Sequence, residues 1–142
     1  MEENINALDE IHKGACMGVD ALNDIINKVE DKNFIKVLKE HLNDYKTIAK
    51  KIEEVYSKYD DDKPHETNVI NKAMTWSSVE METLTDKSNS NIAEFILRGI
   101  NMGVIEGRKI LNKKHIDKEV HNIVSEYVTM QEKHIEVLKN YL

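Results

Sequence analysis

The chain has 142 residues, of which 40% are hydrophobic and 32% are charged, and its formal net charge is -6 at pH 7. This length suits one domain around a single core, and the composition is too apolar for a disordered chain. The acidic balance argues against a nucleic-acid partner, and no run of about 18 apolar residues is present to span a membrane.

The single cysteine and the first residues bear on the cellular compartment. Cys16 is alone, so the chain has no intrachain disulfide and fits a reducing environment. The start of the chain is acidic and polar, whereas a signal peptide begins with a basic and then an apolar segment. We therefore expect a soluble cytoplasmic protein.

The first half of the chain predicts two long amphipathic helices, over residues 3–29 and 33–59. Apolar residues recur every three or four positions, which places one apolar stripe along each helix. The connection at residues 31–33 is short, so the two helices should be antiparallel neighbours. The stripes consist of Ile5, Leu8, Ala15, Val19, Leu22, Ile26 and Val29 in the first helix, and of Phe34, Leu38, Leu42, Tyr45, Ile48, Ile52, Val55 and Tyr59 in the second.

The second half predicts a shorter helix over residues 66–84 and two long helices over residues 91–112 and 117–141. Asn91 and Glu94 have the spacing of a capping box at the start of the second of these three. The helix over 91–112 carries apolar residues nearly all around, so we expect it to be the most buried. No strand pattern is present. The prediction is an all-α protein with one domain over residues 1–142.

A glycine stripe runs along the predicted helix over 91–112. The stripe consists of Gly99, Gly103 and Gly107, and the first helix has a shorter counterpart in Gly14 and Gly18. Each glycine inside a helix costs about 1 kcal/mol relative to alanine, so some other interaction must offset the loss. The stripe could let two helices approach closely, or receive a large side chain such as Trp76 or Tyr45. A groove for a ligand and a break in the helix are the remaining alternatives.

The bundle invites comparison with di-iron proteins, in which carboxylates and Glu-x-x-His pairs face inward from four helices. In this chain Gln131-x-x-His134 keeps the histidine but replaces the carboxylate with an amide. Tyr45 and Ile48 occupy the inward positions of the second helix, and Ile100 borders the corresponding position near the glycine stripe. These residues cannot supply the facing carboxylates, so we expect no di-iron centre.

The same inward positions predict a polar cluster at the bundle centre, made of His12, Tyr45, Gln131 and His134. His12 and His134 both lie at seam positions and are expected to face each other across the bundle. Two buried histidines would repel when protonated, so they would stay neutral, accept hydrogen-bond partners or bind a metal. We interpret this cluster as a binding site and assign no catalytic residue.

No cofactor is expected, and the alternative is a single transition-metal ion. His12 and Cys16 are one helical turn apart, and Asp20 follows at the next turn, so one face offers nitrogen, sulfur and oxygen ligands. His12, His134 and Cys16 would be the ligands of such an ion. The competing interpretation treats His12 as a core histidine and Cys16 as a small apolar filler.

Four stretches also carry a family resemblance: residues 5–13 (INALDEIHK), residues 75–85 (TWSSVEMETLT), residues 96–99 (ILRG) and Gln131-x-x-His134. With them the chain resembles a family of uncharacterised ferritin-like bacterial domains, over nearly its whole length. The resemblance implies an antiparallel four-helix bundle of the ferritin-like type, with a shorter extra helix around Trp76 in the crossover between two hairpins. It implies no established activity.

The chain departs from that family at two places near the glycine stripe. The family tends to have an acidic residue where Ile100 stands, and a tyrosine where Gly107 or Arg108 stands. Both departures remove groups that would serve a metal. The expected function is therefore a non-catalytic binding or assembly module whose di-iron ligands have been lost. The alternative is a metal-binding oxidoreductase, or an iron-handling or stress protein, with a reduced histidine-based site.

The expected partners are limited to a protein or small molecule of unknown identity, with no nucleic acid and no membrane. Helical bundles often pair through apolar stripes on their surfaces, so a homo-oligomer such as a dimer is a further possibility. Ile70, Met74 and Met81 are the candidate residues for such an interface.

Overall fold

A computed structural model describes residues 2–60, 86–113 and 115–142. Within these residues the chain forms four long helices, one short 3₁₀ helix and no β-strand, which confirms the all-α prediction. The elements are α1 (Glu2–Ile26), α2 (Lys32–Tyr56), α4 (Asn89–Leu111), α5 (Lys118–Leu138) and η1 (Lys139–Tyr141). The predicted helix over residues 66–84 lies outside the described residues, and so do Trp76 and the proposed interface residues Ile70, Met74 and Met81.

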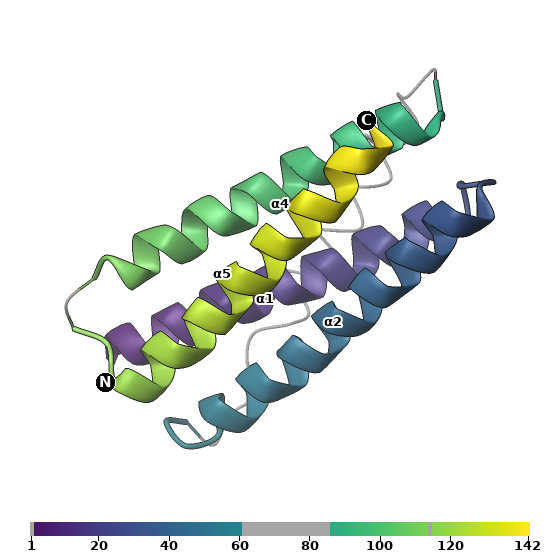
Figure 1. The fold of residues 1–142 in the computed structure, drawn as a ribbon. Helices are drawn as coiled ribbons and strands as arrows, with labels where there is room; N and C mark the ends of the chain where they lie inside the picture. Colours follow the sequence, from purple (N-terminus) through teal and green to yellow (C-terminus); the bar gives the residue numbers. More distant parts are fainter. Residues whose placement is uncertain (1, 61–85, 114) are drawn as a thin grey trace.

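The four helices form a bundle of two antiparallel hairpins (Figure 1). α1 packs along α2, and α4 packs along α5, while α1 faces α4 and α2 faces α5 across the bundle. α2 and α4 run in the same direction, so the end of α2 and the start of α4 lie at opposite ends of the molecule. The hairpins therefore meet along one seam between α1 and α4 and another between α2 and α5, and α1 also packs against α5 across the centre of the bundle.

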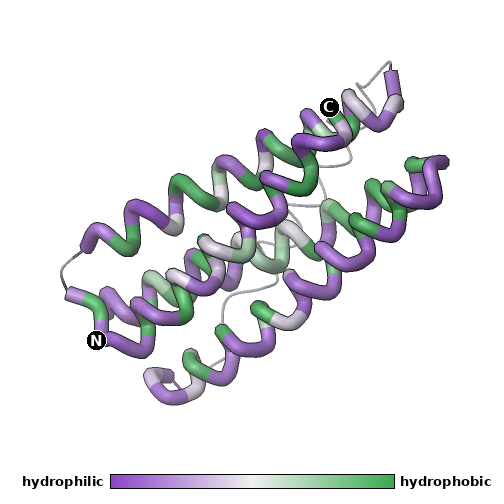
Figure 2. Tube along the Cα trace, viewed as in Figure 1, coloured by the Kyte–Doolittle hydropathy of each residue, from purple (hydrophilic) through white to green (hydrophobic). Residues whose placement is uncertain are grey.

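The predicted apolar stripes form the core of the bundle. Hydrophobic residues recur along every helix between hydrophilic ones (Figure 2), as a one-sided buried face requires. Leu8, Ile11, Leu38 and Ile52 are almost completely buried. Burying a side chain of this size contributes about 1.5–3 kcal/mol. No helix in the described part of the chain is both long enough and apolar enough to cross a membrane.

The start of α4 differs from the prediction, which placed a capping box at Asn91 and Glu94. Ser88 is the N-cap, because its backbone is extended and its hydroxyl accepts a hydrogen bond from the Asn91 amide at 3.3 Å. Glu94 instead forms an ion pair with Arg98, one turn further along the helix, at 3.1 Å. The helix therefore begins at Asn89, two residues earlier than predicted.

The expectation that this helix is the most buried is also wrong. Met102 is 60% exposed and Ile105 is 52% exposed, so α4 presents apolar side chains to solvent. Its buried face is instead a single stripe that includes Ile92, Ile96 and Ile100. The number of apolar residues in a helix does not show whether each one faces the core or the solvent. The apolar composition of this helix therefore predicted more burial than the structure shows.

Contacts at both ends of the bundle join the hairpins. At one end the Asp117 amide donates to Asn4 Oδ1 at 2.7 Å, and the Tyr59 hydroxyl donates to Asp117 Oδ2 at 2.8 Å. At the other end the rings of Phe34 and Tyr141 stack with centroids 4.4 Å apart. The ends are thus held by specific contacts between α1, α2 and the C-terminal hairpin.

Candidate functional site

A cavity of about 470 Å³ lies in the seam between α1 and α4. Its walls are mostly apolar and include Met17, Ala21, Phe95 and Ile100. The charged residues Glu10, Lys13 and Glu106 also border it, and five glycines line it, namely Gly14, Gly18, Gly99, Gly103 and Gly107. The cavity has the volume and the apolar lining that are typical of small-molecule sites.

The glycines give room to large side chains from the neighbouring helices. A Cβ atom on Gly18 would lie 2.7 Å from the Tyr45 ring, and one on Gly14 would overlap the Tyr127 hydroxyl. A Cβ on Gly103 would overlap the carbonyl oxygen of Gln131. The prediction that Tyr45 fills the glycine stripe of α4 is therefore wrong, because Tyr45 lies against Gly18 of α1, while Gln131 and Val128 lie against Gly103 and Gly107 of α4. No break interrupts α4 at its glycines, so that alternative is wrong.

Three of the four residues of the predicted polar cluster meet at the inner wall of this cavity. The Tyr45 hydroxyl donates to Gln131 Oε1 at 3.2 Å. The rings of Tyr45 and His134 meet edge to face, with centroids 5.4 Å apart. A fourth residue, His41, stacks on His134 with centroids 3.8 Å apart and an interplanar angle of 13°. We call His41, Tyr45, Gln131 and His134 the cavity floor.

The floor leaves polar atoms without partners. Gln131 is 1% exposed and His134 is 3% exposed, and both border the cavity. His134 Nδ1 and His41 Nδ1 are buried and have no hydrogen-bond partner within residues 2–60, 86–113 and 115–142, whereas the Gln131 side chain also hydrogen-bonds Tyr127. A buried polar atom that lacks a partner costs about 1–3 kcal/mol, so such atoms call for an explanation.

Asp44, on α2, holds the orientation of the His134 ring through a hydrogen bond. His134 Nε2 lies 2.9 Å from Asp44 Oδ2, and the Asp44 side chain is 51% exposed. A carboxylate can only accept a hydrogen bond, so Nε2 carries the hydrogen and Nδ1 of the neutral ring is a bare acceptor. The hydrogen bond to Asp44 therefore fixes which nitrogen of His134 carries the hydrogen.

Burial keeps the floor uncharged. Desolvation and the neighbouring His134 together lower the pKa of His41 to about 4, while Asp44 opposes the shift. Desolvation also lowers the pKa of His134, although the hydrogen bond to Asp44 opposes the shift. The pKa of Tyr45 is raised well above its usual value, chiefly by burial. At neutral pH the floor therefore offers hydrogen bonds and no charge.

The structure does not place His12 in this cluster. Its Nε2 lies 3.0 Å from Glu53 Oε1, and Cys16 Sγ lies 3.8 Å from the ring. Glu53 follows Asp44, the partner of His134, by nine residues on α2, which is about 13 Å along the helix axis. The expectation that His12 and His134 face each other is therefore wrong, because they lie at different levels of the bundle.

The predicted metal ligands are separated in the same way. His12 and Cys16 are neighbours on α1, but His134 lies with His41 and Asp44 at the other level. In the described ranges no three His, Cys, Asp or Glu side chains are grouped so that they could hold a metal ion. The set His12, Cys16 and His134 is thus not brought together.

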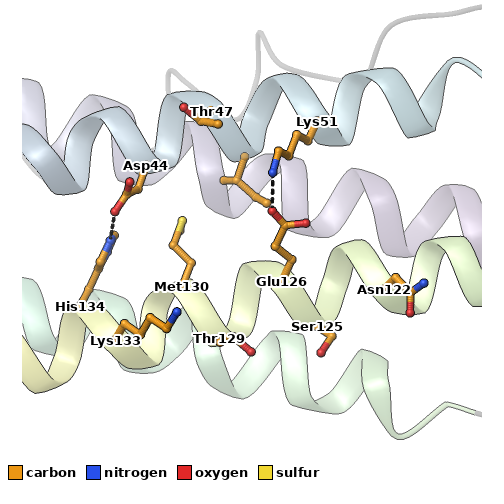
Figure 3. A pocket seen from close by; sticks show the side chains of 11 residues that line it. Asp44, Thr47, Lys51, Asn122, Ser125, Glu126, Thr129, Met130, Lys133 and His134 are labelled. Atoms are coloured by element: carbon orange, nitrogen blue, oxygen red, sulfur yellow. Dashed lines mark hydrogen bonds and ion pairs between the residues drawn. The ribbon is translucent and has the colours of Figure 1, made fainter.

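A second hollow, an open groove of about 660 Å³, follows the seam between α2 and α5 (Figure 3). Charged and polar side chains line it together with the apolar Ile48 and Met130, and Lys51 and Glu126 form an ion pair across it at 2.6 Å. Both side chains are about half exposed, and such pairs contribute little to stability. His134 borders this groove as well as the cavity, so its ring lies between the two hollows.

Sequence reasoning missed His41 and Asp44. The predicted stripe of α2 used Leu42, which is only half-buried, whereas His41 is 6% exposed. The signal was present, because His41 is three residues after Leu38 and four before Tyr45, the spacing of one helix face. Asp44 is exposed, so no pattern of hydrophobicity could mark it as the partner of His134.

Comparisons of the chain with protein-family models, with curated proteins and with solved structures give no match.

Proposed function

We propose that the protein is a non-catalytic binding module that holds a small, largely apolar molecule in the cavity between α1 and α4. The observation that carries the proposal is the cavity itself, which has a volume of about 470 Å³ and a mostly apolar lining that includes Met17, Phe95 and Ile100. Burial of an apolar ligand against these walls would supply the binding energy.

We propose further that the bundle is of the ferritin-like type and has lost its di-iron ligands. Support comes from the two antiparallel hairpins and from the common direction of α2 and α4, which a single long crossover between hairpins produces. Tyr45, Ile48 and Ile100 are buried at the inward positions, where a di-iron protein needs carboxylates and histidines. The lone cysteine supports the proposed cytoplasmic location.

A non-catalytic role is supported by the chemistry of the floor. Tyr45 retains its proton because burial raises its pKa, and His41 remains neutral because burial lowers its pKa. These groups can hold a ligand by hydrogen bonds. Neither has a pKa near neutral pH, and a general acid or base works best when its pKa lies near the operating pH.

The binding test uses N-phenyl-1-naphthylamine, a neutral apolar fluorophore, with the full chain and two matched variants. Ala21 lines the cavity from α1, whereas Ala49 is half-buried on α2 and does not border it. We expect saturable binding of one fluorophore to the parent and to Ala49→Phe, and binding at least about tenfold weaker in Ala21→Phe, whose ring fills the cavity. Equal affinity in both variants would refute the proposed site, once circular dichroism shows that both are folded.

The alternative, a metal-binding oxidoreductase or iron-handling protein, makes a different prediction. Protein purified without chelators would then contain iron, zinc or manganese in stoichiometric amount, and His134→Ala would lose it. Elemental analysis distinguishes the two proposals. Stoichiometric metal that depends on His134 would replace the binding module proposed here.

A further inference from the structure

The cavity between α1 and α4 is long and narrow. Its lining residues extend from Glu10 to Ile25 on α1, roughly 22 Å along the helix axis, and from Phe95 to Gly107 on α4, roughly 18 Å. A sphere with the cavity volume of about 470 Å³ would be only about 10 Å across. The cavity is therefore a channel along the seam, and it suits an extended ligand better than a compact one.

The charges of the lining gather at one end of this channel. α1 and α4 run in opposite directions (Figure 1), so the first half of α1 lies beside the second half of α4. The ring of Tyr127 marks this level, because Cβ atoms on Gly14 and on Gly107 would both approach it. Among the described residues, the charged ones of the lining all lie here, and we call this the charged end: Glu10, Lys13 and Glu106.

The opposite end, which we call the closed end, is apolar and shielded from solvent. Apolar residues that are at most 8% exposed line it there, namely Leu22, Ile25, Phe95 and Ile96. At the charged end, by contrast, Glu10 and Glu106 are exposed and Lys13 is partly exposed. Water therefore reaches the lining where it is charged and is kept from it where it is apolar.

This difference between the ends fits an amphiphile. An alkyl chain gains free energy with each methylene group that it buries, and a chain of many methylene groups can follow the channel. A charged head group would lose its hydration at the closed end, where the lining has no charge to compensate the loss. At the charged end it keeps contact with water, and side chains of both signs are present to pair with it.

We propose that the ligand is a single-chain amphiphile that lies along the seam, with its alkyl chain towards Ile25 and Phe95 and its head group at the charged end. This inference rests on the proposed binding function. It adds the chemical class of the ligand and the direction in which the ligand lies.

Alkylphosphocholines with octyl, decyl and dodecyl chains test the length of the channel. Their head group has no net charge, so the net charge of -6 on the protein favours none of them. A dodecyl chain extends about 15 Å and fits the channel, whereas an octyl chain of about 10 Å would already fill a compact cavity. They are titrated against the full chain below their micelle concentrations, by calorimetry and by displacement of N-phenyl-1-naphthylamine.

We expect the affinity to rise about two- to fourfold with each methylene group from octyl to dodecyl. An affinity that stops rising at octyl would overturn the inference. If the fluorophore binds and none of the three amphiphiles displaces it, the inference is wrong and the binding function stands. If neither the fluorophore nor any amphiphile binds, both proposals fail.

The direction of the bound chain is tested by nuclear Overhauser effects on the dodecyl complex. The terminal methyl group of the chain should show effects to the methyl groups of Ile25 and Ile96, which line the closed end. Effects from the choline methyl groups to these two residues would mean that the head group is buried, and would contradict the proposed direction.

A variant that shortens the channel gives a third test. Ala21 lines the cavity one helical turn before Ile25, so the ring of Ala21→Phe should block the closed end. We expect this variant to lose the preference for dodecyl over octyl, while the control Ala49→Phe, outside the cavity, keeps it. A preference that survives in Ala21→Phe would place the chain elsewhere and overturn the inference. The chain-length series on the parent stands even if the variant fails to fold.

Discussion

At the scale of single residues, the stacked pair His41 and His134 is the least ordinary feature of the core. Two imidazole rings 3.8 Å apart cannot both carry a charge without strong repulsion, and both are buried. Burial and the neighbouring ring lower the pKa of His41 to about 4, well below its value of 6.5 in an unfolded chain. The folded protein therefore binds fewer protons than the unfolded chain between these two pH values.

This difference predicts how stability depends on pH. The free energy of unfolding should decrease as the pH falls from about 6.5 to about 4, because His41 is protonated in the unfolded chain but stays neutral in the folded protein over this range. The loss attributable to His41 is about 1–2 kcal/mol after solvent screening is allowed for. His41→Phe keeps the stacked ring but removes the titration, so its stability should fall less over the same range. Urea unfolding of both proteins at pH 7 and pH 4.5 gives the comparison, and equal losses would contradict the assignment.

The candidate site was partly predictable at this scale. Helical spacing identified Tyr45, Gln131 and His134 as inward polar residues, and the structure brings these three together. Spacing gives the face of a helix but not the level at which two helices meet. His12 was therefore grouped with residues on another level, although it is equally buried.

At the scale of elements, the glycines explain how two tyrosines and an amide fit inside a bundle. Tyr45 and Tyr127 lie against Gly18 and Gly14 of α1, while Gln131 lies against Gly103 of α4. The intrinsic cost of glycine in a helix, about 1 kcal/mol each, is offset by the packing of the large side chains that it admits. The glycine stripe thus serves packing, and it also opens one wall of the cavity.

Replacement of Gly103 tests this role. Its added Cβ would overlap the Gln131 carbonyl oxygen and lie 3.1 Å from Gln131 Cδ, so Gly103→Leu should destabilise the protein by about 1–3 kcal/mol through overpacking. The control is Asn101→Leu, at an exposed position of the same helix, where little change is expected. Thermal melts of the two variants are compared with the parent. If Gly103→Leu melts like the parent, the close-packing account is wrong.

At the scale of the whole molecule, the two hairpins are joined at their ends and leave hollows between them along the middle of the bundle. Contacts at the ends, such as Asn4 with Asp117 and Phe34 with Tyr141, fix the hairpins to each other. Between the ends the seam of α1 and α4 opens into the cavity, and the seam of α2 and α5 carries the open groove. His134 lies between the two hollows, which makes the cavity floor part of the joint between the hairpins.

Much of the architecture followed from the sequence, because long amphipathic segments with short links leave few other arrangements. The segments over 3–29, 33–59, 91–112 and 117–141 correspond to α1, α2, α4 and α5 within a few residues. The degree of burial did not follow, as Met102 and Ile105 show, because an apolar residue can face solvent. The cavity did not follow either, because its volume depends on how far apart α1 and α4 lie.

The central claim is that a ligand binds between α1 and α4. Its most direct test is the set of nuclear Overhauser effects between bound N-phenyl-1-naphthylamine and the methyl groups of the full chain. We predict effects to Met17, Ile100 and Met102, which line the cavity. Effects confined to Thr47 and Thr129, which line the groove between α2 and α5, would place the ligand in the wrong seam and contradict the account.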